Sequence, residues 1–423
     1  MSRRAWARWD RMLRPQGFST LDDLLKRGAS QGSRCLLRVD LNVPMDGSRV
    51  MDVTRFERIV PTIGELRAAG FRIGLLSHFG RPKGEVREDM SLEPVARALA
   101  DYLKHPVAFL GDCIGEAGAQ AFSKLSAGDV GVFENTRFHK GESANDLTFA
   151  QALANNGDIY VNDAFSASHR AHASIVGLAG LLPCYVGRAM TGELESLERY
   201  LGGDLSRPAI ALIGGAKLTG KLSLLKALAE RFDALILGGG MANLFLAARG
   251  IAVGASLYEP DRIADARALE SLAQEHGCKL LLPRDVIVAR ECVAHAPTRS
   301  VDLSKDTVGD DEKILDVGEE SLRVMAGHFE TASTFVWNGP LGVFEVPPFE
   351  QGGEVAARHV AMLTRLGSMV SVAGGGETAM LLEQAGAMED FSYMSAGGGA
   401  FLCWLEGKGL TGVDAARAAC AGS

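Results

Sequence analysis

The sequence lacks the features that mark membrane-spanning proteins and proteins that coat nucleic acids. No stretch approaches the roughly 18 to 20 uninterrupted apolar residues of a membrane-spanning helix. The 423 residues carry 44 basic and 52 acidic side chains, a formal charge of −8, whereas proteins that coat nucleic acids or membrane surfaces normally carry a basic excess. We therefore expect a soluble protein with no nucleic-acid or membrane partner.

Cysteine is scarce and scattered. The chain has seven cysteines, an odd number, at positions 35, 113, 184, 278, 292, 403 and 420, and no Cys-x-x-Cys pair. This pattern predicts neither a disulfide framework nor a zinc knuckle. It fits a reducing environment, and we expect a cytoplasmic location.

A secretory signal is also missing. Residues 1–17 contain five arginines and two tryptophans but no apolar core segment. An Arg-rich organellar presequence is an alternative, against which Asp10 counts. We favour an additional N-terminal arm, disordered, or a misplaced start codon.

Glycine, by contrast, is abundant. Its 50 residues make up about 12% of the chain, against a usual share of about 7%. The length suggests two or three domains, each able to bury its own core. The positions of the glycines therefore need an explanation within such domains.

Short apolar runs that end in turn residues alternate with amphipathic helical stretches from residue 18 onward. Helical periodicity is clear at 92–103 and 221–232. The apolar runs are continuous rather than alternating, which is typical of parallel strands buried on both faces. We expect an α/β protein with doubly wound parallel sheets and strands at 35–43, 72–78, 130–135, 159–164, 209–215, 234–240, 279–289, 334–339 and 369–376.

A helix near the middle divides the chain. Residues 191–201 place Thr191 as a cap, acidic residues in the first turn and leucines on one face. The turn-rich segment 202–208 follows. We therefore predict two lobes, 18–188 and 205–401, joined by a connecting helix and hinge at 189–204.

The two halves differ in the residues that follow their strands, where ligands of open α/β sheets bind. The first half presents charged and polar groups, and the second half presents glycine pairs and triplets near 214, 238, 374 and 397. Arginine matches carboxylate and phosphate oxygens, while glycine frees backbone N–H groups for phosphates. We infer a small anionic substrate in one half, a nucleotide in the other, and transfer between them after the lobes close.

Three generic motifs nearly match. Residues 215–221 fit a P-loop, but Leu222 replaces the Ser or Thr that would hold magnesium. Residues 374–379 satisfy the loose dinucleotide pattern late in the chain. Residues 28–32 match a nucleophile elbow in the wrong context, so a serine hydrolase is discarded. His169 and His172 could ligate a metal, but an ordered loop is the better interpretation.

Several longer sequence motifs are specific enough to indicate a protein family. RVDLNVP at 38–44, Arg55 followed by VPTI, SHFGRP, ENTRF, HRAH, GGAK, GGGMA, VWNGPLGVFE and two late glycine-rich turns occur in the order seen in phosphoglycerate kinases. From about residue 18 to its end, the chain resembles this family.

The resemblance implies reversible, magnesium-dependent phosphoryl transfer between 1,3-bisphosphoglycerate with ADP and 3-phosphoglycerate with ATP. It also implies two doubly wound lobes with an open cleft between them, a monomer, and a C-terminal segment, 402–423, that returns to the N-terminal lobe.

The resemblance further implies roles for particular residues. Residues that would hold 3-phosphoglycerate are Asp40, Asn42, Arg55, His78, Arg81, Arg137 and Arg170. Residues that would contact the nucleotide are Lys217, Lys221, Gly238, Gly239, Asn338, Pro340, Glu345, Gly374, Gly375, Gly376, Glu377 and Thr378, with Glu377 also on the magnesium ion. Residues that would act on the group in transfer are Arg55, Lys217, Lys221, Gly376 and Gly399, the last within the Gly397–Gly399 run.

The chain departs from the family pattern at several positions. Glu377 stands where the family usually has aspartate, Gly220 where an aspartate commonly precedes the second lysine, and Ala396 where a threonine is usual. Ser166-Ala-Ser168 also replaces the common Gly-Thr-Ala. Two alternatives therefore stay open: a catalytically silent nucleotide-binding paralogue, and a P-loop-type NTPase that uses residues 215–221.

Overall fold

The computed structural model describes residues 17–28 and 31–421 and divides the chain into two compact units. Residues up to 199 together with those from 409 onward form the first unit, and residues 200–408 form the second. Most of the expected N-terminal arm at 1–17, and Ser30 of the discarded nucleophile elbow, lie outside the described residues.

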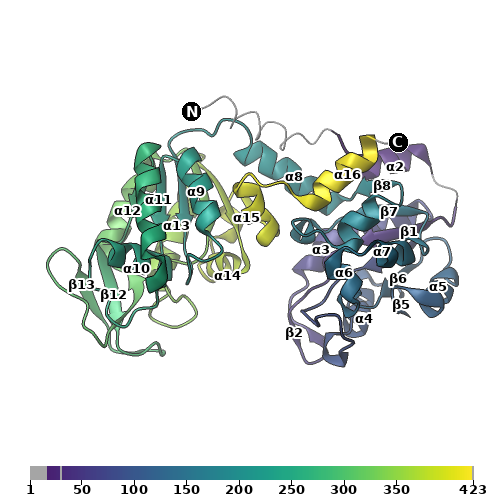
Figure 1. The fold of residues 1–423 in the computed structure, drawn as a ribbon, viewed down its shortest axis with the longest axis horizontal. Helices are drawn as coiled ribbons and strands as arrows, with labels where there is room; N and C mark the ends of the chain where they lie inside the picture. Colours follow the sequence, from purple (N-terminus) through teal and green to yellow (C-terminus); the bar gives the residue numbers. More distant parts are fainter. Residues whose placement is uncertain (1–16, 29–30, 422–423) are drawn as a thin grey trace. The chain divides into compact units, whose positions relative to one another are not determined.

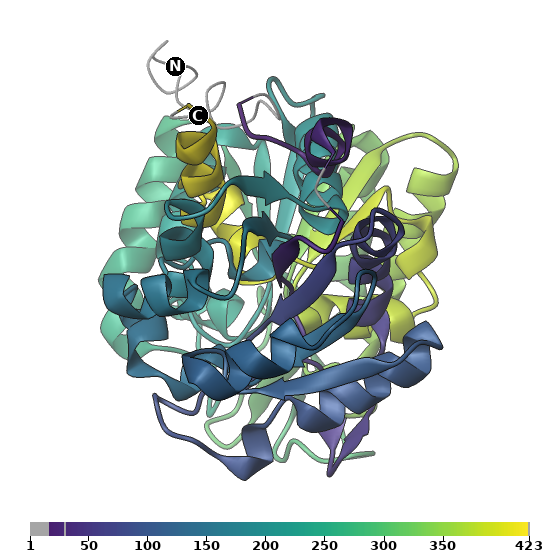
Figure 2. The same cartoon turned by 90° about the vertical axis from the view of Figure 1, so that its right-hand side faces the viewer.

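The first unit is built on a six-stranded parallel sheet with the strand order β5-β6-β4-β1-β7-β8 (Figures 1 and 2). Its strands are β1 (Arg34–Arg38), β4 (Arg72–Leu76), β5 (Val107–Gly111), β6 (Val130–Phe133), β7 (Ile159–Asn162) and β8 (Cys184–Val186). The central strand β1 pairs Cys35 with Ile73 on one side and with Ile159 on the other. A two-stranded hairpin, β2 (Met45–Asp46) and β3 (Arg49–Val50), stands apart from the sheet.

Helices cover the sheet of the first unit. They are α2 (Leu21–Arg27), α3 (Thr54–Ala68), α4 (Glu93–Leu103), α5 (Gly115–Ser123), α6 (Lys140–Ala144), α7 (Leu147–Ala154), most of α8 (Arg188–Leu201) and, from the end of the chain, α16 (Thr411–Ala421). Leu36 and Leu37 point to opposite faces of β1 and both are fully buried. Burial on both faces explains why these strands are continuous apolar runs.

The second unit repeats this architecture with the strand order β11-β10-β9-β15-β16-β17, again all parallel. Its strands are β9 (Ala209–Ile213), β10 (Ala234–Leu237), β11 (Lys279–Leu281), β15 (Thr334–Asn338), β16 (Val370–Gly374) and β17 (Tyr393–Ser395). Its helices are α9 (Leu222–Arg231), α10 (Gly239–Ala248), α11 (Ile263–Glu275), α12 (Glu319–Thr331), α13 (Gln351–Arg365), α14 (Gly376–Gln384) and α15 (Gly399–Leu405). The fully buried Trp337 lies in its core, and its indole N–H donates to the Gly339 carbonyl at 2.8 Å.

A small antiparallel sheet with the order β13-β12-β14 is attached to the second unit. It contains β12 (Asp285–Ala289), β13 (Arg299–Asp302) and β14 (Lys313–Val317). The single strand predicted at 279–289 is therefore wrong. Pro283 lies in the break between β11 and β12, which belong to different sheets.

The structure confirms the α/β class, the two parallel sheets and strands in the other predicted segments. The predicted cap at Thr191 is wrong, because α8 already begins at Arg188 and the Thr191 hydroxyl donates to the Gly187 carbonyl within the helix. The second boundary between the units falls after residue 408, later than residue 402, where we expected the returning segment to begin. Phe401 of α15 packs tightly against Gly374 of the second unit.

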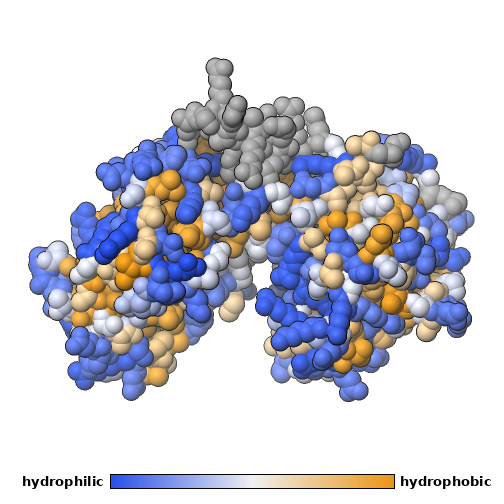
Figure 3. Space-filling model, in the orientation of Figure 1, coloured by the Kyte–Doolittle hydropathy of each residue, from blue (hydrophilic) through white to orange (hydrophobic). Residues whose placement is uncertain are grey.

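The visible surface of each unit is mainly hydrophilic, with smaller hydrophobic patches between (Figure 3). Among the described residues, no helix combines the length and the apolar character needed to cross a membrane.

Candidate active site

Charged and polar side chains gather where four strands of the first unit end. Asp40 and Asn42 follow β1, His78 and Arg81 follow β4, and Arg137 follows β6. Arg170 comes after β7. These strands are neighbours in the order β6-β4-β1-β7, so their carboxyl ends meet at one edge of the sheet.

Arg137 shows that this edge is strongly cationic. Burial and, to a lesser extent, the nearby charges of Arg170, Arg38 and Arg81 together lower the pKa of its guanidinium to about 10, against the opposing effect of Glu142. One terminal nitrogen donates to the Gly80 carbonyl at 2.8 Å, whereas the other, Nη2, is buried without a hydrogen-bond partner among the described residues. We call Arg38, Arg81, Arg137 and Arg170 the arginine cluster. This cluster offers an anion both positive charge and a buried hydrogen-bond donor.

Arg38 was missed by the sequence analysis as a site residue. It lies at the end of β1 and is fully buried, with its Nε donating to the Ser174 hydroxyl at 2.9 Å and its Nη2 lying 3.0 Å from His78 Nδ1. Burial and the charge of Arg38 hold the pKa of His78 well below its ordinary value, so His78 is neutral. The signal that could have identified Arg38 is its position, as a charged residue at the end of a continuously apolar strand.

Asp40 connects several of the predicted residues. Its carboxylate forms an ion pair with Arg55 and accepts hydrogen bonds from the Ser166 hydroxyl and, at 3.0 Å, from the Asn42 backbone N–H. Burial would raise the pKa of Asp40, but Arg55, His78 and these hydrogen bonds hold it below its ordinary value. The Asn42 side-chain oxygen accepts from the Gly80 N–H at 2.8 Å. Asp40, Asn42, Arg55 and His78 thus belong to one connected group.

The glycines of the second unit lie where neighbouring strands end, and close packing requires them. A Cβ atom on Gly214 would come within 1.8 Å of the Pro340 carbonyl oxygen, and one on Gly240 within 2.3 Å of the Ala216 carbonyl oxygen. Gly239, Gly375 and Gly398 have positive φ angles of 62°, 106° and 48°. Part of the glycine surplus therefore lies in turns that only glycine fits.

Lys221 and Asn338 tie these turns together. The Lys221 ammonium donates to the Gly214 carbonyl at 2.8 Å and to the Asn338 side-chain oxygen at 2.9 Å, while the Asn338 amide donates to the Gly374 carbonyl at 2.7 Å. Burial lowers the pKa of Lys221, and the charge of Glu377 opposes this effect. Lys221 is thus held at the edge of the sheet near the Glu377 carboxylate.

A pocket of about 700 Å³ opens beside the turns, large enough for a nucleoside. The predicted residues among those that line it are Gly239, Pro340, Glu345 and Glu377. Its walls also include residues that the sequence analysis missed: Leu257, Tyr258, Cys292, Lys313, Ile314, Leu315 and Asp316. They come from β14 and from two loops, and no local motif marks them.

The remaining predicted nucleotide residues are not among those that line this pocket. Gly238 is the residue before α10, and Gly376 and Gly399 open α14 and α15. Thr378 is fully buried, and its hydroxyl accepts from the Gly339 N–H at 2.7 Å. Its side chain therefore stabilises the turn after β15, whereas the resemblance implied a contact with the nucleotide.

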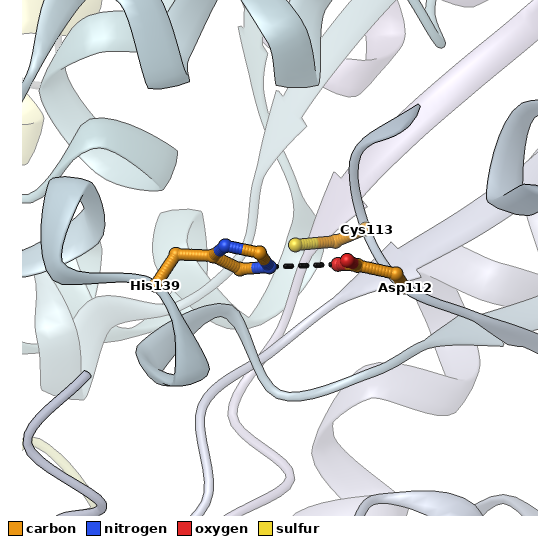
Figure 4. Close-up of side chains that lie close together, drawn as sticks. All are labelled: Asp112, Cys113 and His139. Atoms are coloured by element: carbon orange, nitrogen blue, oxygen red, sulfur yellow. Dashed lines mark hydrogen bonds and ion pairs between the residues drawn. The ribbon is translucent and has the colours of Figure 1, made fainter. Parts of the chain in front are cut away.

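Two groups of side chains bear on metal binding. Glu377 is exposed in the first turn of α14, and a carboxylate that leaves room for phosphate and water oxygens suits Mg²⁺. Asp112, Cys113 and His139 bring three potential ligand atoms within 4.8 Å of one another, with a 2.7 Å contact between His139 Nε2 and Asp112 (Figure 4). The buried thiol makes this group unlike a magnesium site. His169 and His172 belong to no such group among the described residues.

Comparison with known proteins agrees with this geometry. Residues 25–408 match the family model "Phosphoglycerate kinase". The chain is 54% identical to the phosphoglycerate kinase of Methylorubrum populi over 401 residues, 95% of this chain and 99% of that protein, and 52% identical to that of Rhizobium meliloti over 400 residues, with the same coverage.

Solved structures are similar as well. The phosphoglycerate kinase of Coxiella burnetii matches with a TM-score of 0.81 and 35% identity, covering 94% of this chain and 98% of that one. That of Pyrococcus horikoshii OT3 matches with a TM-score of 0.80 and 27% identity, covering 95% and 99%. Together with the fold, these matches show that the chain belongs to the phosphoglycerate kinase family.

Proposed function

We propose that the first unit binds 3-phosphoglycerate at the arginine cluster and that the second unit binds ATP or ADP in the pocket beside its glycine turns. The transferase activity follows from the family, and this division of ligands is our assignment. The observation that carries it is the buried, unpartnered Nη2 of Arg137 among further cations. An anion with several oxygens would satisfy that donor and offset the repulsion within the cluster.

The reaction requires mainly that the protein position the two substrates and neutralise their charge. The carboxylate of 3-phosphoglycerate is ionised near neutral pH, so no general base is needed. Arg55 and Lys221 are assigned to the developing charge on the transferred group. Arg55 is paired with Asp40, and Lys221 is held by Gly214 and Asn338. We expect each cation to change these partners when ligands bind.

Magnesium belongs to the proposal as a companion of the nucleotide. Glu377 would hold it from the first turn of α14, with phosphate oxygens and water as its other ligands. When bound, the ion offsets negative charge on the phosphates. The protein's own contribution is to present the Glu377 carboxylate near Lys221, whose pKa responds to that charge.

A coupled assay tests the proposal. The purified protein is mixed with ATP, magnesium and 3-phosphoglycerate, and product formation is followed through glyceraldehyde-3-phosphate dehydrogenase and the oxidation of NADH. We expect oxidation that requires all three additions. A rate no higher than that of the blank without the protein would refute the kinase assignment and leave the silent paralogue. ATP hydrolysis that does not need 3-phosphoglycerate would support the P-loop-type NTPase.

The proposal also covers the oligomeric state and the cellular location of the protein. The resemblance and the scattered cysteines support a monomer in the cytoplasm. Light scattering of the purified protein tests the first point, and a mass near 44.9 kDa is the expected result.

A further inference from the structure

The loop of residues 214–221, which we call the lysine loop, has a sharply defined form. It carries Lys217 and Lys221, and its glycines Gly215 and Gly220 have φ angles of +120° and +89°. Its own main chain closes one turn, in which the Lys221 N–H donates to the Leu218 carbonyl at 2.8 Å. Residues 216, 217, 219 and 220 are exposed. Such an exposed loop needs outside contacts to hold two lysines in fixed places.

Glu259 supplies these contacts from another part of the chain. One of its carboxylate oxygens accepts from the backbone N–H groups of Leu218, at 2.6 Å, and Thr219, at 3.0 Å. The other oxygen accepts from the Thr219 hydroxyl. A carboxylate that accepts three hydrogen bonds at once fixes both the position and the orientation of the main chain.

Charge at Glu259 agrees with this geometry. Burial would raise the pKa of the carboxyl group, but the hydrogen bonds from Thr219 and Leu218 and the nearby Arg262 lower it. Arg262 itself forms an ion pair with Asp265 at 2.8 Å and lies 3.4 Å from the Thr219 hydroxyl. Glu259 is therefore ionised at neutral pH, the state in which it accepts at both oxygens.

The segment around Glu259 also belongs to the nucleotide pocket. Its neighbours Leu257, Tyr258 and Pro260 line the pocket wall. The bonds of Glu259 consequently join the wall beside the base to the loop that carries the phosphate-binding lysines.

We propose that Glu259 is a positioning residue for phosphoryl transfer: its carboxylate holds the lysine loop in the form that presents Lys217 and Lys221 to the nucleotide phosphates. This inference rests on the proposed nucleotide site of the second unit. The aspartate common before the second lysine is replaced by Gly220, whose φ of +89° strains any other residue. Gly220 has no side chain, and Glu259 supplies the carboxylate that accepts from the Leu218 and Thr219 N–H groups.

Glu259→Gln tests the proposal, because the amide keeps the size of the side chain but turns one acceptor oxygen into a donor. We expect the KM for ATP to rise about tenfold and kcat to fall, with the KM for 3-phosphoglycerate changed less than twofold. Thr219→Val should weaken nucleotide binding in the same direction. The double variant should be little worse than Glu259→Gln alone, since both remove one interaction.

Asp261→Asn is the matched control. It removes the same charge two residues away, from an exposed side chain that accepts none of the loop's N–H groups among the described residues. Its kinetic constants should match those of the wild type. A uniform effect of lost charge would instead move both variants equally and overturn the proposal.

Two measurements without turnover separate this inference from the proposed function. Amide hydrogen exchange at Leu218 and Thr219 should accelerate about tenfold in Glu259→Gln, while exchange in α9 stays unchanged. Calorimetric titration with ADP and magnesium should show weaker binding. If the wild type binds ADP and Glu259→Gln binds and exchanges as the wild type does, the positioning role is wrong. If the wild type itself neither binds ADP nor turns over, the proposed function fails instead.

Discussion

At the scale of single residues, the arginine cluster of the first unit holds positive charge that the one acid acting on Arg137, Glu142, does not offset. The chain as a whole carries a formal charge of −8, yet the pKa of Arg137 is lowered by burial and by the nearby charges of Arg170, Arg38 and Arg81. Glu142, which is fully buried nearby, has its carboxylate occupied by the N–H and the hydroxyl of Ser174. Net charge therefore says little about a site that a few buried residues control.

Arg137→Lys should weaken substrate binding. Lysine keeps the charge but loses the planar group that contacts Gly80 and presents a second nitrogen to the anion. We expect the KM for 3-phosphoglycerate to rise about tenfold while the KM for ATP changes little. Steady-state kinetics with each substrate varied in turn measure both values. Arg97→Lys, on the exposed face of α4, is the control, and an equal rise in both KM values would contradict the assignment.

Glu377→Asp should change the magnesium dependence. The aspartate usual in the family is one methylene shorter, and Mg²⁺ tolerates little displacement of its ligands. We expect the half-saturating magnesium concentration to fall several-fold in the variant, measured as initial rate against free magnesium at constant ATP. An unchanged curve would mean that the longer glutamate side chain has no consequence for the metal.

At the scale of secondary-structure elements, the sequence predicted the strands buried on both faces well. Their unbroken apolar runs are a strong local signal, as at 209–215 and 334–339, which became β9 and β15. The signal failed at the edges of the fold. The edge strands β5, β8 and β17 are short or less buried, and the β12 sheet is antiparallel, so their sequences carry weaker patterns.

Prediction of the candidate site has the same limit: residues that follow a strand are found, and residues brought in by distant segments are missed. Arg137 and Gly214 stand directly after strands, where the position alone suggests a role. Lys313 and Ile314 line the pocket of the second unit, and Glu259 accepts from the Leu218 N–H, because the tertiary structure brings β14 and the 255–260 loop there.

The strand β14 contains a buried carboxyl group that should make stability depend on pH. Burial raises the pKa of Asp316 to about 7, although the backbone N–H groups of Gly352 and Val317 donate to it at 2.7 and 2.8 Å. A pKa raised above its unfolded value means that the group stabilises the fold most at low pH. This contribution is lost as pH rises from about 4 to 7.

Asp316→Asn should remove that dependence. The free energy of unfolding of Asp316→Asn minus that of the wild type should be about 2 kcal/mol larger at pH 8 than at pH 5. Urea titrations followed by tryptophan fluorescence, to which Trp337 and Trp404 of the same unit contribute, measure the difference. Asp310→Asn, an exposed carboxyl group of this unit, is the control. A constant difference between wild type and Asp316→Asn across this range would contradict the raised pKa.

At the scale of the whole molecule, the chain ends in the unit where it begins. The last helix, α16, contacts β8 and the 173–177 segment of the first unit. The Gly412 N–H donates to the Ser168 carbonyl at 2.8 Å, and the Thr411 hydroxyl donates to the same oxygen at 3.2 Å. Ser168 comes two residues before Arg170, so the end of the chain supports one part of the arginine cluster.

Gly412→Ala should therefore impair substrate binding as well as stability. A Cβ atom there would meet Ile175 at 2.7 Å and the Ser168 hydroxyl at 2.9 Å, both inside the buried contact. We expect a loss of about 1–2 kcal/mol in the stability of the first unit and a several-fold weaker affinity for 3-phosphoglycerate, with the affinity for ADP unchanged. Calorimetric titration with each ligand and thermal unfolding measure these effects. Gly192→Ala, where a Cβ atom meets nothing within 4 Å, is the matched control. If Gly412→Ala lowers stability but leaves 3-phosphoglycerate binding intact, α16 supports the fold of the first unit without positioning Arg170.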